Sequence, residues 1–111
     1  MTPALQKALA ARGWKEDAQA ARCGVWRLCW RPPGAGPGLE AYLCDEVVGY
    51  RAEVYWYTGD GAYPQQVFRQ EASAFERIRE PLQLAAQAET ALLRADAVLR
   101  LGGRPGLENP G

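Results

Sequence analysis

Three segments of the chain, residues 25–31, 39–44 and 51–57, alternate between two kinds of side chain with a period of two. One set of positions is apolar throughout: Trp26, Leu28, Trp30, Leu39, Ala41, Leu43, Ala52, Val54 and Trp56. The other set carries Arg, Glu, Tyr and Cys. Such alternation is typical of strands that bury one face. The pattern predicts an antiparallel meander that helices cover on one side only.

The connection between the first two strands constrains how they pair. Residues 31–38, RPPGAGPG, contain prolines and glycines that cannot continue a ladder, which indicates a hairpin loop. If the apolar faces coincide, one allowed register places Arg31 opposite Glu40, a favourable cross-strand pair of opposite charge. The same register places Cys29 opposite Tyr42, so that Cys29 does not face Cys44.

Two later segments leave the size of the sheet open. The connection 45–50 is either a six-residue loop or a tight turn at Val48-Gly49 between longer strands, which would set Glu46 opposite Arg51. Residues 65–69 suit a fourth strand at the edge of the sheet, because proline precedes them and a β-branched valine lies among them. We therefore expect three or four strands.

The N-terminal segment predicts a helix followed by a short irregular or extended stretch. Thr2-Pro3 provides a capping side chain and a proline at the first helical position, and Gly13 is a natural helix end. Residues 14–23 have mixed propensities for strand and helical turn, and they are interpreted as a short strand or an irregular segment. We expect Trp14 to be buried against the first helix.

The C-terminal part predicts a long helix that is kinked or broken near Pro81, because proline removes one helical hydrogen bond and clashes with the preceding turn. Ser73 and Glu76 form a capping box, and Gly102-Gly103 end the helix. The apolar positions with helical spacing are Phe75, Ile78, Leu82, Ala85, Ala86, Leu92, Leu93 and Leu99. The predicted common core contains Trp26, Leu28, Trp30, Leu43, Val54, Trp56, Phe75, Ile78 and Leu92.

Length and composition fit one α+β domain over residues 1–103, with a flexible, Pro/Gly-rich tail over 104–111. Thirteen basic and thirteen acidic residues give a formal net charge of zero, which argues against binding of nucleic acid or membrane through bulk charge. No segment has the apolar length of a signal peptide or a membrane span, so we expect a cytoplasmic protein. Arginine outnumbers lysine strongly, which suggests a GC-rich bacterial or phage source.

Most catalytic chemistry lacks the residues it needs. The chain contains no histidine, which excludes histidine-based triads and histidine metal sites. The spacing of Cys23, Cys29 and Cys44 matches neither a zinc site nor a disulfide framework. A thiolate beside Arg27 or Arg51 would have a lowered pKa, but two small strand residues without a chemical role explain the cysteines better. We therefore expect no metal, no cofactor and no enzymatic activity.

The remaining candidate is a surface that we call the polar face. Its residues are Arg27, Arg31, Glu40, Tyr42, Arg51, Glu53, Tyr55 and Tyr57. Tyrosine and arginine are enriched in protein interfaces and among the residues that contribute most to binding. An ordinary charged exterior, or a face covered by the chain's own helix, would use the same residues.

The function expected from this surface is binding of a protein partner. Immunity proteins, secretion chaperones and phage-encoded inhibitors are non-enzymatic accessory proteins of this size and composition, and self-association into a homodimer is a further possibility. An alternative is single-stranded nucleic-acid binding by stacking of bases on Tyr42, Tyr55 and Tyr57. Zero net charge, together with Glu40 and Glu53 on the same face, argues against this alternative.

Overall fold

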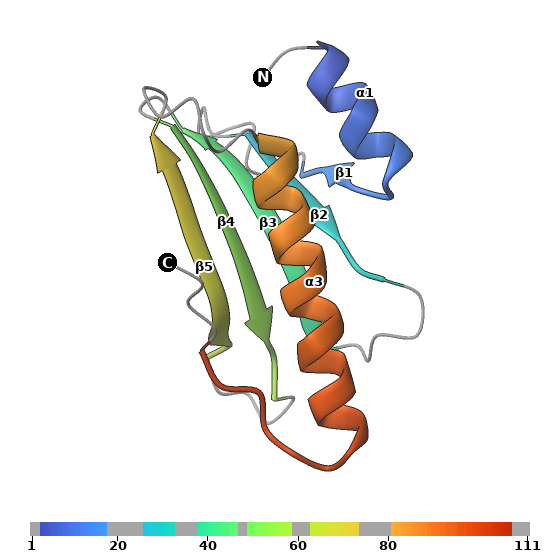
Figure 1. The fold of residues 1–111 in the computed structure, drawn as a ribbon, viewed down its shortest axis with the longest axis vertical. Helices are drawn as coiled ribbons and strands as arrows, with labels where there is room; N and C mark the ends of the chain where they lie inside the picture. Colours follow the sequence, from blue (N-terminus) through green and yellow to red (C-terminus); the bar gives the residue numbers. More distant parts are fainter. Residues whose placement is uncertain are drawn as a thin grey trace.

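The computed structural model describes residues 3–17, 26–32, 38–46, 49–58, 63–73 and 81–107. Two helices and five strands lie in these ranges (Figure 1): α1 (Pro3–Ala11), β1 (Lys15–Glu16), β2 (Trp26–Trp30), β3 (Leu39–Glu46), β4 (Gly49–Trp56), β5 (Gln65–Ser73) and α3 (Pro81–Arg100). The strands form one antiparallel sheet in the order β1-β2-β3-β4-β5. The predicted α+β meander is confirmed, with five strands in place of three or four.

The short strand β1 and the edge strand β5 account for the larger sheet. Lys15 and Glu16 pair with β2 along the edge that faces away from β3. The segment 14–23 therefore includes a short strand, one of the two alternatives predicted for it. The predicted edge strand at 65–69 extends through Ser73. Pairing along nine residues of β5 satisfies backbone groups that a three-stranded sheet would leave unpaired on β4.

The register of β2 and β3 is the one expected from the matching of apolar faces. Cys29 lies opposite Tyr42, and Trp30 lies opposite Ala41. The turn between β3 and β4 is tight, since Glu46 pairs with Gly49, but the predicted pairing of Glu46 with Arg51 is wrong. The partner of Glu46 lies two residues earlier on β4 than a turn at Val48-Gly49 would place it, and Cys44 lies opposite Arg51 instead.

A bulge in the pairing of β4 with β5 changes which β5 side chains reach each face. Val54 lies opposite Phe68, whereas the next residue, Tyr55, lies opposite Gln66. Val67 is therefore the extra residue of β5 at this point. Val67 and Phe68 are both buried although they are consecutive, and Gln66 reaches the opposite face.

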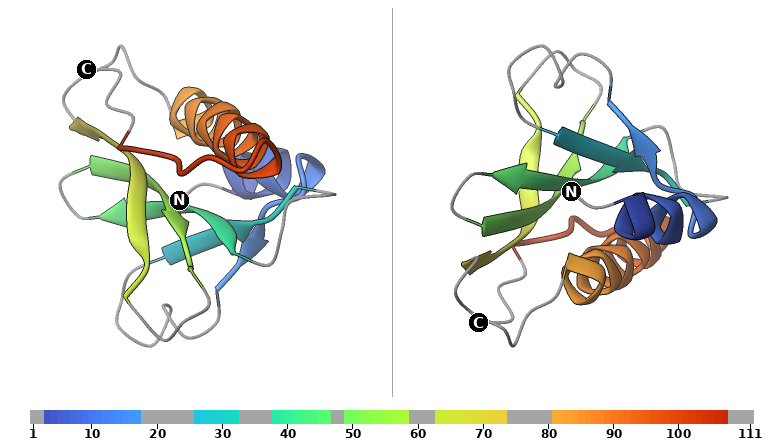
Figure 2. Two further views of the ribbon diagram at one scale, coloured as in Figure 1. Left: turned by 90° about the horizontal axis from the view of Figure 1, so that it is seen from below. Right: turned by 90° about the horizontal axis from the view of Figure 1, so that it is seen from above.

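Both helices lie on the apolar side of the sheet, as the two end-on views in Figure 2 show. Helix α3 packs across β3, β4 and β5, and α1 contacts α3 beside β1. The sheet contributes fully buried Leu39, Ala41, Leu43, Ala52 and Val54 to the core. This confirms the assignment of inward positions on β3 and β4.

The buried face of α3 differs from the predicted one. Its buried residues are Leu84, Ala85, Ala88, Ala91, Leu92 and Ala95. Four alanines let the helix backbone approach the sheet closely, so the helix presents small residues there and turns Leu93 outward, 53% exposed. The predicted placement of Leu93 on the apolar stripe is therefore wrong.

The described part of the predicted core is confirmed for three residues and only partly for two others. Leu43, Val54 and Leu92 are fully buried, while Trp30 and Trp56 are partly exposed and pack against the core. The side chains of Trp26 and Leu28, and the whole of Phe75 and Ile78, lie outside the described residues.

Trp14 is buried at 2% exposure, as predicted, and it joins α1 to the rest of the core. Its ring stacks on that of Trp30 with a centroid separation of 6.3 Å and an interplanar angle of 19°. Its indole N–H donates to Glu89 of α3 at 3.3 Å. Gly13, with φ of +92°, ends α1 and allows the amide of Trp14 to bond the carbonyl of Leu9 at 3.0 Å.

The second helix ends in the same way, and it begins at the proline near which a kink or break is predicted. Residues 74–80, which precede it, lie outside the described residues, so the kink or break stays a prediction. Helix α3 starts at Pro81, and Gly102, with φ of +81°, ends it. Ser73 is the last residue of β5, and the rest of the capping box lies outside the described residues. Of the tail, residues 104–107 are described, with Pro105 buried, and its flexibility stays a prediction. In the described part of the chain no helix has the length and apolarity needed to cross a membrane.

Candidate functional site

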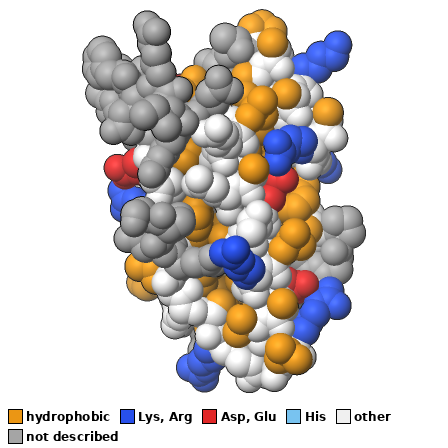
Figure 3. All heavy atoms as spheres, in the orientation of Figure 1, with side chains coloured by type: hydrophobic (Ala, Val, Ile, Leu, Met, Phe, Trp, Pro, Cys, Tyr) orange, Lys and Arg blue, Asp and Glu red, His pale blue; other side chains and the backbone are white. Residues whose placement is uncertain are grey.

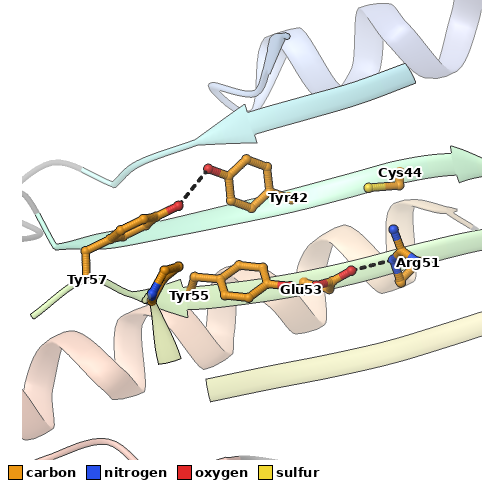
Figure 4. A pocket seen from close by; sticks show the side chains of 7 residues that line it. Tyr42, Cys44, Arg51, Glu53, Tyr55 and Tyr57 are labelled. Atoms are coloured by element: carbon orange, nitrogen blue, oxygen red, sulfur yellow. Dashed lines mark hydrogen bonds and ion pairs between the residues drawn. The ribbon is translucent and has the colours of Figure 1, made fainter. Parts of the chain in front are cut away.

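The polar face lies on the side of the sheet opposite α3 and is hollowed into a pocket of about 210 Å³ (Figure 4). We call this hollow the Tyr pocket, and its lining residues are Tyr42, Cys44, Arg51, Glu53, Tyr55, Tyr57 and Pro64. All but Pro64 and Tyr57 belong to β3 or β4. Successive side chains of a strand alternate between faces, so the lining residues of each strand are two apart: Tyr42 and Cys44 on β3, and Arg51, Glu53 and Tyr55 on β4.

Glu53 forms the floor of the Tyr pocket and is the one buried charged residue among those described, 7% exposed. One of its carboxylate oxygens pairs with the Nε of Arg51 on the same strand. The other oxygen accepts bonds from the hydroxyl of Tyr55 and, at 3.0 Å, from the side-chain amide of Gln66 on β5. Two hydrogen bonds and one ion pair therefore compensate the removal of this carboxylate from water.

A second carboxylate, Glu40, organises the opposite wall of the pocket. Its two oxygens accept bonds from the guanidinium of Arg31 and from the hydroxyl of Tyr42. The Tyr42 and Tyr57 hydroxyl oxygens lie 3.3 Å apart, as the dashed line in Figure 4 marks. Burial, followed by the bond to Glu40, raises the pKa of Tyr42 far above its usual value, so its hydroxyl keeps its proton.

The tyrosine rings also contact one another, which fixes the shape of the pocket. The rings of Tyr42 and Tyr55 meet edge to face, with centroids 5.9 Å apart and an interplanar angle of 70°. This geometry brings the positive edge of one ring to the negative face of the other. Tyr57 stands at the mouth of the pocket, 36% exposed. The walls are thus held before any ligand arrives.

Charges on β5 extend the polar face to the edge of the sheet. Glu71 lies opposite Arg51, and Arg69 lies opposite Glu53, so unlike charges face each other across the strands. The guanidinium of Arg69 also bonds Glu71 at 2.5 Å, which lowers the pKa of that carboxyl. The described part of the face therefore carries balanced charge and gives no cationic track of the kind that nucleic-acid binding uses.

Neither of the two described cysteines, Cys29 and Cys44, is in a disulfide, and their environments differ. Cys44 lines the Tyr pocket and is buried. Burial, followed by the charge of Glu40, raises the pKa of the Cys29 thiol, so the lowered pKa considered for a thiolate near arginine is not found there. Cys23 lies outside the described residues, among which no cluster of acidic and cysteine side chains has the makings of a metal site.

Most residues predicted for the polar face come together. Tyr42, Arg51, Glu53, Tyr55 and Tyr57 line the pocket, and Glu40 and Arg31 adjoin it through the hydroxyl of Tyr42. The backbone of Arg27 pairs with Cys44, and its side chain lies outside the described residues.

The sequence interpretation missed Pro64, which directly precedes β5, and Gln66, the second residue of β5. Gln66 reaches Glu53 only because of the bulge at Val67, and alternation alone does not reveal a bulge. Cys44 was recognised on this face by its parity, but no binding role was assigned to it.

The opposite side of the molecule is different in character. Seen from the α3 side, Figure 3 shows hydrophobic side chains separated by basic and acidic ones. Leu93, Val98 and Leu101 are exposed along or just after α3. Val98 also lines a second hollow, of about 290 Å³, with Val67, Ala91 and Leu107. The Tyr pocket is the stronger candidate for a functional site, because a buried charge, Glu53, lies in it, whereas no residue lining the second hollow is a buried charge.

Comparisons with protein-family models, with curated proteins and with solved structures gave no match to this chain. The function is therefore argued from the site itself.

Proposed function

We propose that the chain is a non-enzymatic binding module that occupies a protein partner with the polar face of its sheet. The observation that carries this proposal is the Tyr pocket, in which three tyrosines surround a buried carboxylate on the side away from both helices. An inhibitor, immunity or chaperone-like accessory protein of bacterial or phage origin would act in this way, by occupation and not by chemistry.

The energetics of the pocket favour binding to a macromolecular surface. Binding costs less when the contact side chains are already ordered. Here Tyr42 and Tyr55 are ordered by bonds to Glu40 and Glu53, so little rotamer entropy remains to be lost. Tyrosine offers a large contact area with two torsions, which is why it is frequent in binding surfaces.

The charge pattern favours a protein over a single-stranded nucleic acid. Three described arginines on this side of the sheet, Arg31, Arg51 and Arg69, each pair with a glutamate. A phosphate backbone approaching these arginines would have to displace or face the glutamates. A protein partner can match alternating charges with its own, which improves specificity more than affinity.

The test is capture of partners from the source cell by tagged protein, with a matched pair of tyrosine variants. Tyr57→Ala removes a side chain at the mouth of the Tyr pocket, whereas Tyr63→Ala removes one that is 94% exposed and outside the pocket. A captured protein is then purified, and its affinity for wild type and both variants is measured by calorimetry. We expect Tyr57→Ala to weaken binding at least tenfold and Tyr63→Ala to leave it unchanged.

Two outcomes would overturn the proposal. Equal affinity of the purified partner for wild type and Tyr57→Ala would place the interface elsewhere. Tight binding of a single-stranded oligonucleotide that weakens steeply with salt and is lost in Tyr57→Ala would favour the nucleic-acid alternative. Sedimentation of wild type and Tyr57→Ala distinguishes a partner from a second copy of the chain.

A further inference from the structure

The directions of the hydrogen bonds in the Tyr pocket indicate which chemistry it accepts. A tyrosine hydroxyl has one proton to donate and lone pairs that accept. Tyr42 donates its proton to Glu40, and Tyr55 donates its proton to Glu53. Because Tyr42 has no second proton, the 3.3 Å contact between the Tyr42 and Tyr57 hydroxyls requires Tyr57 to be the donor.

All three hydroxyl protons are therefore directed within the site. The Tyr42 oxygen accepts one bond from Tyr57, and the Tyr55 oxygen accepts one from the side-chain amide of Gln66 at 3.3 Å. A ligand meets the remaining oxygen lone pairs, above all those of Tyr57, and the ring faces. Lone pairs accept hydrogen bonds, and the negative face of an aromatic ring attracts cations. An anionic ligand would need donors that the tyrosines have already committed. The hydrogen-bond polarity of the pocket thus selects a ligand that donates hydrogen bonds and carries positive charge.

Arg51 is the one described cation in the lining, and its position leaves room for a second. Its Nε pairs with Glu53. Figure 4 shows Arg51 and Tyr57 at opposite ends of the lining, with Glu53 and Tyr55 between them. The part of the pocket that can accept a cation is the end formed by Tyr42, Tyr55 and Tyr57. The hydroxyls of Tyr42 and Tyr55 there bond directly to the carboxylates of Glu40 and Glu53.

The size of the pocket limits what enters. About 210 Å³ is smaller than the roughly 300–1,000 Å³ of sites for drug-sized ligands. We propose that the Tyr pocket accepts one lysine or arginine side chain of the protein partner, with its ammonium or guanidinium group among the three tyrosines. This inference rests on the proposed function, because it takes the occupant to be part of a protein.

The test uses n-butylammonium as a mimic of the lysine side chain, with n-butanol and butyrate as neutral and anionic controls of equal chain length. Each is titrated into isotopically labelled protein at constant ionic strength, and the NMR signals of the tyrosine rings are followed. We expect saturable shifts of Tyr55 and Tyr57 with n-butylammonium at millimolar concentrations. Tyr57→Ala should weaken this binding about fivefold, the loss of one ring–cation contact, and Tyr63→Ala should not change it.

Butyrate binding as tightly as n-butylammonium, or no saturable shift with n-butylammonium, overturns the inference. The two proposals fail separately. A protein partner that needs Tyr57, combined with no n-butylammonium binding, keeps the binding function and removes the cationic occupant. If n-butylammonium binds at the tyrosines but Tyr57→Ala does not change the affinity for the partner, the pocket binds cations and the protein interface does not use it. That result overturns the inference that a lysine or arginine of the partner occupies the pocket.

Discussion

Replacing Glu53 by glutamine perturbs the best-connected polar residue of the sheet while preserving its shape. The carboxylate accepts hydrogen bonds from Tyr55 and Gln66, forms an ion pair with Arg51, and belongs to a residue that is 7% exposed. Glutamine keeps one acceptor oxygen and turns the other into a donor. Whichever way the amide is oriented, at least one of the present donors then faces an NH₂ group and loses its partner.

The expected cost follows from these contacts. A donor left unsatisfied in a buried site costs about 1–3 kcal/mol. Loss of the ion pair with Arg51 destabilises the protein further. This contribution is smaller than the roughly 3–5 kcal/mol of a fully buried pair, because the Arg51 side chain is 25% exposed and water can solvate it. We therefore expect Glu53→Gln to lower the free energy of unfolding by about 2–4 kcal/mol.

Urea unfolding followed by tryptophan fluorescence measures this change. With a slope of roughly 1.5–2 kcal/mol per molar urea, the midpoint should fall by about 1–2.5 M. Glu71→Gln is the matched control, since Glu71 also pairs with an arginine on the polar face but its side chain is 58% exposed, and its midpoint should hardly move. Equal midpoints for wild type and Glu53→Gln would refute the reasoning, because the carboxylate would then be solvated in the folded protein.

Three further predictions concern the rest of the fold. Leu92→Ala should lower the free energy of unfolding by about 2–5 kcal/mol, because Leu92 is fully buried, whereas Leu93→Ala should leave the urea midpoint nearly unchanged. Equal effects of the two substitutions would mean that the buried face of α3 is misassigned. Gly13→Ala and Gly102→Ala both place alanine at positive φ, which should destabilise the protein by about 1–2 kcal/mol each. Only at Gly13 does the new Cβ also fall 2.3 Å from an indole nitrogen, so thermal unfolding should show a larger loss of stability for Gly13→Ala. Cys29 should react with iodoacetamide at pH 8 more slowly than free cysteine, as peptide mass mapping would show, because its pKa is raised; a faster reaction would contradict that direction.

Several features of this protein follow from the sequence alone. The period-two alternation determined which side chains of β3 and β4 face the helices, because successive side chains of a strand point to opposite faces. The requirement that apolar faces coincide, together with the charges of Arg31 and Glu40, determined the register of β2 and β3. The glycines after both helices determined where the helices end, because a residue with positive φ is needed there.

Other features were decided only when the elements packed together. The sequence places Tyr42, Glu53 and Tyr55 on one face of the sheet. It does not show that Glu53 is buried, because its burial depends on the neighbouring side chains that converge on it. The contribution of Gln66 depends on a bulge whose position is set by how β5 fits β4 and α3.

The face of α3 was also decided by contact and not by hydrophobicity. Alanines lie against the sheet and Leu93 points outward, because close approach of a helix to a sheet favours small side chains at the centre of the contact. A sequence pattern thus determines approximately which side of a helix or strand is apolar. The packing distance between elements determines which residues of that side are buried, and which polar residues opposite them become a site.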